Sequence, residues 1–142
     1  MIPRRSYLKR SKPPARRSRP RTMRRGKRAA EKRSLAYLWR VKVRAKNGGQ
    51  CVIRRLNFSH VCWGPIQAAH CFGVDEAPAV RLALWNGEPV CAEGHEFYER
   101  RKTAWRGFLF QLWGPYLYAE RLGLARSTVK VDLDAARQEL SV

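Results

Sequence analysis

The sequence is poor in acidic residues and contains no long apolar run. Among 142 residues there are 11 Asp and Glu against 30 Lys and Arg, for a formal charge of +19. A compact chain with this charge repels itself unless an anion neutralises it, so we expect a polyanionic partner such as nucleic acid. No apolar stretch approaches the roughly 18–20 residues that a membrane-spanning helix needs, and we expect no membrane partner.

The basic N-terminus also lacks the apolar segment that a secretion signal requires. The chain has 4 cysteines. Without a secretion signal, these cysteines indicate reduced thiols or metal ligands rather than a disulfide framework. We therefore expect a cytoplasmic protein.

The positive charge is concentrated near the N-terminus. Residues 1–33 hold 15 of the basic residues and one acidic residue, whereas residues 34–142 hold 15 basic and 10 acidic residues. Residues 1–28 combine four prolines with dense Arg and Lys and few apolar residues, which is typical of disorder. We predict a disordered basic arm over residues 1–33 whose guanidinium and ammonium groups contact phosphates. The candidate nucleic-acid-binding residues are Arg4, Arg5, Lys9, Arg10, Arg16, Arg17, Arg19, Arg24, Arg25, Lys27 and Arg28.

The remaining residues, about 110 in number, are long enough for one modest core. Helical spacing of Leu35, Leu38 and Trp39 predicts a helix over residues 29–46, which Asn47-Gly48-Gly49 should end. Further expected elements are strands at residues 51–53 and 66–70, a turn at Asn86-Gly87, a helix over 91–112 broken at 113–115, and helices over 116–122 and 127–140 on either side of Gly123.

Three polar residues follow one another in a specific context. His70 ends the sequence Gln67-Ala68-Ala69-His70, Asn86 begins Asn86-Gly87-Glu88-Pro89-Val90-Cys91, and His95 ends Cys91-Ala92-Glu93-Gly94-His95. This order resembles the HNH ββα-metal nuclease family, in particular its phage members, over about residues 36–118. The resemblance implies an α+β fold with a two-stranded hairpin packed on a helix, a divalent cation such as Mg²⁺ or Mn²⁺, and DNA as the partner.

The resemblance also implies roles for these residues. His70 would be the general base, because an imidazole can deprotonate water near neutral pH. His95 would bind the cation, which offsets charge on the phosphate, and Asn86 would brace the loop and orient His70. Glu99 lies four residues after His95 and so faces the same side of a helix, as a second metal ligand or as a surface partner of Lys102.

Two departures from the family pattern weaken these implications. Ala69 occupies the position before the general base, where many members have a metal-binding His or Asp. The family's structural zinc often uses two CxxC pairs, but Cys51 and Cys91 each lack the second cysteine. Zinc needs four nitrogen or sulfur ligands. Cys62 is a candidate third ligand, while the directions of Cys71 and His60 are open. We expect an abandoned zinc site with Cys51 and Cys91 as core residues and no stoichiometric zinc.

The C-terminal segment supports a rival interpretation. Residues 119–130, with Gly123 in the turn, resemble the helix-turn-helix of bacterial regulators, in which Ser127 to Lys130 would open a recognition helix. Acidic residues Asp132, Asp134 and Glu139 would meet phosphates there and favour a helix that closes the core instead.

We therefore expect an arm (1–33), an HNH-like nuclease core (34–112) and a C-terminal helical segment (113–142). The expected function is metal-dependent hydrolysis of DNA phosphodiester bonds, in phage replication or recombination and in the host cytoplasm if the chain is phage-encoded, with no small-molecule substrate. The alternatives are a non-catalytic DNA-binding protein, either a helix-turn-helix regulator or an inactive HNH fold, and, from the arm alone, a ribosomal or RNA-packaging protein.

Overall fold

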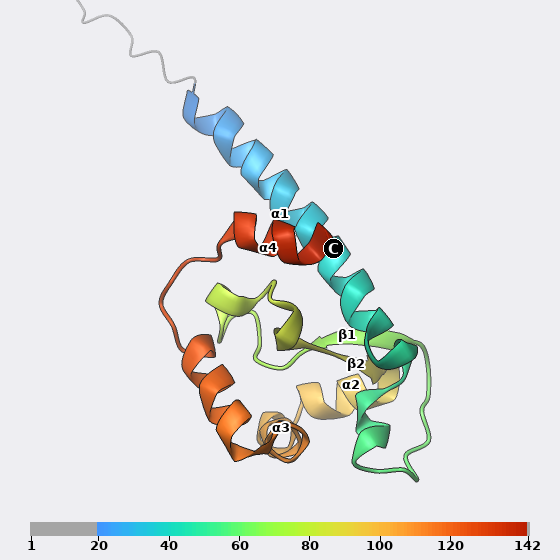
Figure 1. Cartoon of the computed structure of the whole chain (residues 1–142). Coiled ribbons are helices and arrows are strands. Elements are labelled where there is room, and N and C mark those ends of the chain that lie inside the picture. The colour runs from blue at the N-terminus through green and yellow to red at the C-terminus, as the bar shows by residue number, and fades with distance from the viewer. Residues whose placement is uncertain (1–19, 142) are drawn as a thin grey trace, which may run out of the picture.

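The computed structural model describes residues 20–141, with side chains from residue 25 onward, and has mixed helix and strand. Figure 1 shows a long N-terminal helix lying across a small hairpin, with the C-terminal helix beside that long helix and the two middle helices on the other side of the hairpin. The regular elements are α1 (Pro20–Ala45), β1 (Ile66–His70), β2 (Gly87–Cys91), α2 (Ala92–Glu99), α3 (Lys102–Ala125) and α4 (Leu133–Ser141). Four short 3₁₀ helices connect them: η1 (Lys46–Gly49), η2 (Val52–Arg55), η3 (Pro78–Val80) and η4 (Leu84–Asn86). The α+β class is confirmed.

Helix α1 begins earlier than the sequence pattern predicts. It starts at Pro20, so the prediction of disorder over residues 1–33 is wrong for residues 20–33. Proline is favoured in the first turn of a helix, and the Ala, Arg, Lys and Glu that follow have good helix propensity. The predicted stop is confirmed, since Asn47 and Gly48 adopt φ values of 54° and 65° directly after the helix. The candidate phosphate-binding residues from Arg4 to Arg19 lie outside the described residues.

Helix α4 closes a core against α1 and does not form a helix-turn-helix with α3. Its buried Leu133, Ala136 and Leu140 pack with Leu35, Trp39 and Val43 of α1. Residues 127–132 have no regular structure, so Ser127 to Lys130 do not open a recognition helix, and the favoured interpretation of a helix that closes the core agrees with the structure. Asp132 explains the later start, because its Oδ1 accepts from the backbone N–H groups of Asp134 (2.9 Å) and Ala135 (3.0 Å) as a helix cap.

Strands β1 and β2 form an antiparallel hairpin that leads directly into α2. The register pairs Ile66 with Cys91 and His70 with Gly87. The strand at residues 66–70 is confirmed, whereas the strand expected at residues 51–53 is wrong. Val52 and Ile53 instead lie in η2 and are buried in the main core, a case where a short apolar run does not distinguish strand from helix. Asn86 ends η4, and Gly87 begins β2.

The helix expected over residues 91–112 is divided into α2 and α3 at Arg100 and Arg101. The break at residues 113–115 is a kink within α3, where Gly114 has φ 77° and ψ 166°, and the helix then continues past Gly123 to Ala125. Trp105, Phe108 and Leu109 of α3 complete the main core beneath the hairpin. None of the described helices is long and apolar enough to cross a membrane.

Candidate functional site

The imidazole of His70 is held in one orientation at the end of β1. Its Nε2 lies 3.0 Å from the carbonyl oxygen of Arg81, an acceptor, so Nε2 carries the proton and Nδ1 keeps its lone pair when the ring is neutral. The ring also stacks on Trp39 of α1, with centroids 4.1 Å apart. Burial, and to a lesser degree the positive charge of Arg81, lower the pKa of His70 below its usual value of 6.5. His70 is therefore neutral at pH 7.

Asn86 ties the two ends of the loop between β1 and β2 together. Its side chain is fully buried and accepts from the backbone N–H of Phe72 at 2.8 Å through Oδ1. Its Nδ2 donates to the carbonyl oxygens of Phe72 and Val80, both at 3.2 Å. Asn86 thus orients His70 through the loop backbone rather than by direct contact, because Val80 precedes Arg81, whose carbonyl binds the His70 ring.

His95 lies in the first half of α2 with one ring nitrogen already engaged. Its Nδ1 donates to Oε1 of Gln67 on β1 at 2.6 Å, which leaves Nε2 free. A second-sphere hydrogen bond of this kind fixes the tautomer of metal-binding histidines. Gly94, directly before His95, is closely packed, since an added Cβ there would press on Cδ1 of the buried Ile53 and force that side chain to shift. The close packing of α2 on η2 therefore fixes the position of His95.

His70 and His95 line one cleft of about 300 Å³ between the hairpin and helices α2 and α3. Trp105 of α3 anchors the β1 side of this cleft by donating to the carbonyl oxygen of His70 at 3.2 Å. Cationic and acidic side chains lie on its walls, and the full lining includes Ala69, Asp75, Glu76, Tyr98, Glu99, Lys102 and Arg106. The cleft thus combines a neutral imidazole, a free imidazole nitrogen and groups of both charges.

Glu99 lies in the same cleft and within the described part of the chain forms no ion pair with Lys102 or another cation. Ala69 is buried in the wall of this cleft, so a methyl group lies where the resemblance to HNH nucleases would place an additional metal ligand. Among residues 25–141, the cleft residues do not form a group of three or more metal-binding atoms. His95 and Glu99 both line this cleft from α2, and Asp75 and Glu76 line it from the loop after β1.

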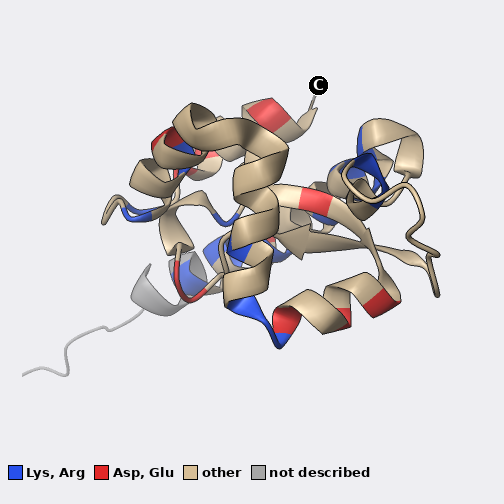
Figure 2. Ribbon diagram, turned by 90° about the horizontal axis from the view of Figure 1, so that it is seen from below, with Lys and Arg blue, Asp and Glu red and all other residues tan. Residues whose placement is uncertain are grey.

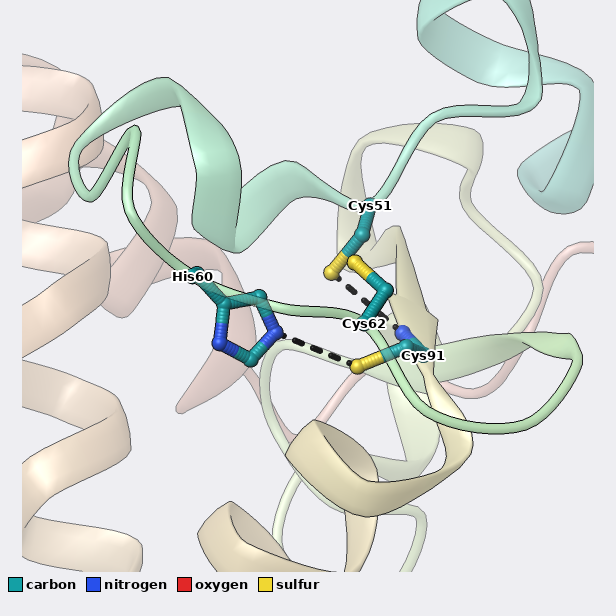
Figure 3. A group of neighbouring side chains, drawn as sticks. All are labelled: Cys51, His60, Cys62 and Cys91. Carbon is teal, nitrogen blue, oxygen red and sulfur yellow. Dashed lines mark hydrogen bonds between the residues drawn. The ribbon is translucent and has the colours of Figure 1, made fainter.

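A separate cluster of three cysteines and one histidine lies outside this cleft. The ligand atoms of Cys51, His60, Cys62 and Cys91 all lie within 4.8 Å of one another, and Figure 3 shows the three Sγ atoms and the ring of His60 converging. Nitrogen and sulfur ligands of tetrahedral Zn²⁺ lie about 3.5–3.8 Å apart, so a small contraction would complete the site. The cluster could hold a metal ion.

Backbone N–H groups are directed at two of the sulfur atoms in this cluster. Sγ of Cys51 accepts from the backbone N–H of Cys91 at 3.3 Å, and Sγ of Cys91 accepts from that of Gly94 at 3.4 Å. Cys91 also caps the N-terminus of α2, where the helix dipole stabilises negative charge. Partial desolvation and the nearby Sγ atoms of Cys51 and Cys91 raise the pKa of Cys62 to about 11. A bound cation would remove that penalty, because thiolates must form for metal binding.

The expectation of an abandoned zinc site, with Cys51 and Cys91 as isolated core residues, is therefore wrong as a description of the geometry. Both are buried, but Cys62 and His60 complete a four-ligand group around them. His60 was left without a role by the sequence, although the spacing His60-Val61-Cys62 was a usable signal. Cys71 lies apart from this cluster, and its thiol donates toward the carbonyl oxygen of Trp85 at 3.8 Å.

The charged residues near the cleft that holds His70 and His95 alternate in sign along the chain. In Figure 2, acidic residues mark α2 and are followed at once by the basic segment that joins it to α3. That segment is Arg100, Arg101 and Lys102.

Three of the residues expected to contact nucleic acid lie on α1 and are exposed: Arg25, Lys27 and Arg28.

Comparison of the chain with protein-family models, curated proteins and solved structures finds no match.

Proposed function

We propose that the chain is a metal-dependent HNH-type endonuclease that hydrolyses DNA phosphodiester bonds. The single observation that carries the proposal is the pair of histidines in one cleft of a ββα unit, each with one nitrogen fixed by a hydrogen bond and the other free. In His70 the free atom is Nδ1, and in His95 it is Nε2. The free Nδ1 of His70 suits a proton acceptor, and the free Nε2 of His95 suits a metal ligand.

Within this proposal His70 accepts the proton of the attacking water at Nδ1. The hydrogen bond from Nε2 to the Arg81 carbonyl keeps that tautomer and then stabilises the imidazolium that forms. The ammonium group of Lys102 lines the cleft and, within the described residues, forms no ion pair, so it is free to contact a phosphate oxygen. The stacked Trp39 prevents rotation of the His70 ring away from the cleft.

The donor set of the cleft fits a hard divalent cation held by few protein ligands. Mg²⁺ commonly keeps several waters and takes only one or two protein ligands together with substrate phosphates. Nε2 of His95 and the carboxylate of Glu99 would hold it. When bound, the cation would offset the charge that develops on the phosphate and the leaving oxygen.

A cleavage assay tests this proposal. The protein should nick or cut plasmid, branched or single-stranded DNA in Mg²⁺ or Mn²⁺. The activity should be lost when both of these ions are left out of the reaction. Absence of cleavage on all three substrates with either metal would contradict the proposal.

Ala69 gives a prediction in the direction of increased activity. Ala69→Asp should tighten Mg²⁺ binding, because the new carboxylate would lie beside His95 and Glu99 in the cleft and supply a third ligand. Cleavage should then reach half of its maximal rate at a lower Mg²⁺ concentration, by about tenfold if the ligand contributes ~1.4 kcal/mol. Ala69→Asn is the matched control for size. An unchanged Mg²⁺ requirement in Ala69→Asp would show that the cation does not bind at this position.

We further propose that the Cys51, His60, Cys62 and Cys91 cluster binds a structural Zn²⁺ ion. Three thiolates and one imidazole are a common closed zinc set, and soft sulfur ligands select zinc over Mg²⁺. The cluster joins η2, the loop after it and the start of α2, so the ion would cross-link segments far apart in sequence.

The second candidate function is a DNA-binding protein without catalytic activity. Ala69 favours it, because the resemblance places a metal-binding His or Asp at that position, and a methyl group binds no metal. The same cleavage assay discriminates the two functions, since a silent binder would retain DNA affinity and cleave none of the substrates. No regulator of the helix-turn-helix type is proposed, because α4 buries its apolar face against α1.

The basic residues before α1 give a prediction about affinity. Deletion of residues 1–19, which removes eight Lys and Arg and leaves α1 intact, should weaken binding to all DNA sequences alike. The slope of log affinity against log salt should fall by about 0.9 for each phosphate of duplex DNA that the shortened chain no longer neutralises. Replacement of the same residues by a Gly/Ser segment is the control for length. If the full-length and shortened chains bind with equal affinity and equal salt dependence, residues 1–19 do not bind phosphates.

A further inference from the structure

The loop between η2 and β1 exposes aromatic side chains although its backbone is held in place. Phe58 is 85% exposed and Trp63 is 67% exposed. The loop starts with the backbone N–H of Asn57 bonded to the carbonyl of Ile53 at 2.9 Å. It ends with the carbonyl of Trp63 accepting from the N–H of Glu93 at 3.3 Å. His60 and Cys62 of the metal cluster lie between these two points. The rings are thus presented on a fixed loop.

A cleft of about 290 Å³ lies directly beside Phe58. Two guanidinium groups, from Arg54 and Arg55, and two amides, from Asn47 and Gln50, line it. Figure 1 shows η2 and this loop at one corner of the molecule, away from α4. The cleft therefore combines an aromatic face with cations and with neutral hydrogen-bonding groups that can both donate and accept.

The two charged residues that line this cleft, Arg54 and Arg55, are both cationic. Residues 32–74 contain eight Lys and Arg and no Asp or Glu. An apolar protein partner would gain little from the guanidinium groups, and a duplex offers no free base face to an aromatic ring. A single-stranded nucleic acid satisfies all the groups present, since its bases stack on aromatic rings, their edges bond amides, and its phosphates bind guanidinium groups.

We propose that η2 and the loop from Leu56 to Gly64 form a binding site for unpaired DNA, with a base stacked on Phe58 and the adjoining phosphates bound by Arg54 and Arg55. The proposal rests on the proposed function in taking DNA as the partner, and it specifies that this DNA carries a single-stranded segment. The metal cluster has the role of holding the loop so that Phe58 is presented beside the cleft.

Fluorescence anisotropy tests this site with zinc-loaded protein that carries His70→Ala, so that no probe is cleaved. The probes are a labelled oligothymidine and a blunt duplex of equal length. Phe58→Ala should weaken binding of the single strand by about 5- to 150-fold, the range that loss of base stacking produces, and change duplex affinity by less than about twofold. Phe58→Trp should restore single-strand binding. Replacement of Arg54 and Arg55 by Gln should lower the salt slope on single strands by about 0.7 for each phosphate that these guanidinium groups neutralise.

Tyr116→Ala is the matched control, since Tyr116 is a 92% exposed aromatic residue on α3, and it should leave both affinities unchanged. Unchanged single-strand binding in Phe58→Ala, or equal losses on single strand and duplex, would overturn the proposal. Tight binding of oligouridine but not of oligothymidine would overturn DNA as the partner. Because these measurements need no cleavage, the two proposals can fail separately. If Phe58→Ala weakens single-strand binding but the parent protein with His70 intact cleaves no DNA, this site stands and the nuclease is rejected. If the parent protein cleaves DNA but Phe58→Ala leaves single-strand binding unchanged, the nuclease stands and this site is rejected.

Discussion

His70→Ala is expected to lower the rate of DNA cleavage by about 10²- to 10⁴-fold, the usual contribution of a general base. The loss should appear in the rate and not in DNA affinity. Affinity depends on many of the 30 Lys and Arg side chains, and removal of one neutral imidazole changes the electrostatic contribution to binding very little. Single-turnover cleavage and equilibrium binding on the same substrate measure the two effects separately.

His95→Ala provides the matched comparison. It should also lose cleavage, but through the cation, so higher Mg²⁺ or Mn²⁺ should restore part of its activity. No concentration of metal should restore His70→Ala, because the missing group is a proton acceptor. If His70→Ala cleaves as fast as the parent protein, His70 is not the base and the proposed mechanism is wrong.

The pH dependence of cleavage by the parent protein should also report His70 as the base. The base is active when neutral, so cleavage should fall as the pH decreases through the pKa of His70. Burial lowers that pKa below 6.5, so the acidic decline should lie at a lower pH than for an exposed imidazole. Trp39→Leu removes the stacked ring that helps to bury His70 and should move the decline upward, toward 6.5. A decline centred well above 6.5 in the parent protein would contradict this explanation.

Local sequence patterns predicted the parts of the fold that depend on neighbouring residues. The strand ending at His70 and the stop at Asn47-Gly48 both follow from backbone preferences that operate within a few residues, and both are confirmed. The expected start of α4 at residue 127 was too early, because the carboxylate of Asp132 caps the helix and places its first turn at Leu133. The same apolar spacing is compatible with either start of the helix, and the capping residue selects one of them. Periodicity alone does not reveal which residue is the cap.

In the candidate sites, too, the sequence predicts some features and the folded chain determines the others. The order of His70, Asn86 and His95 was visible in sequence, but their hydrogen-bond partners Arg81 and Gln67 were not, because these contacts depend on how the hairpin folds. The sequence names Cys51, Cys62 and Cys91 as candidate zinc ligands, but it leaves the direction of His60 open and so does not predict the complete cluster. Cys51 and Cys91 are 40 residues apart along the chain, and the loop that brings His60 and Cys62 to them has no periodic pattern. Only the folded backbone places these four ligands together.

Loss of the metal at this cluster is expected to have the largest effect on stability. Protein purified without added zinc should contain about one equivalent of Zn²⁺, and Cys62→Ser should lose it. The apparent free energy of Zn²⁺ binding in small structural sites is about 10–16 kcal/mol at pH 7. Since whole domains are stable by only ~5–15 kcal/mol, loss of the ion should leave η2, the loop and the start of α2 largely unfolded.

Cys71→Ala is the matched control for this experiment, because Cys71 is a buried free cysteine outside the cluster. It should keep its zinc and show only the modest loss of stability that a small cavity causes, on the order of 1 kcal/mol. Metal analysis and thermal unfolding of the two variants and of chelated parent protein distinguish the cases. A parent protein with far less than one equivalent of zinc, or a Cys62→Ser variant as stable as Cys71→Ala, would show that the cluster does not stabilise the fold through a metal ion.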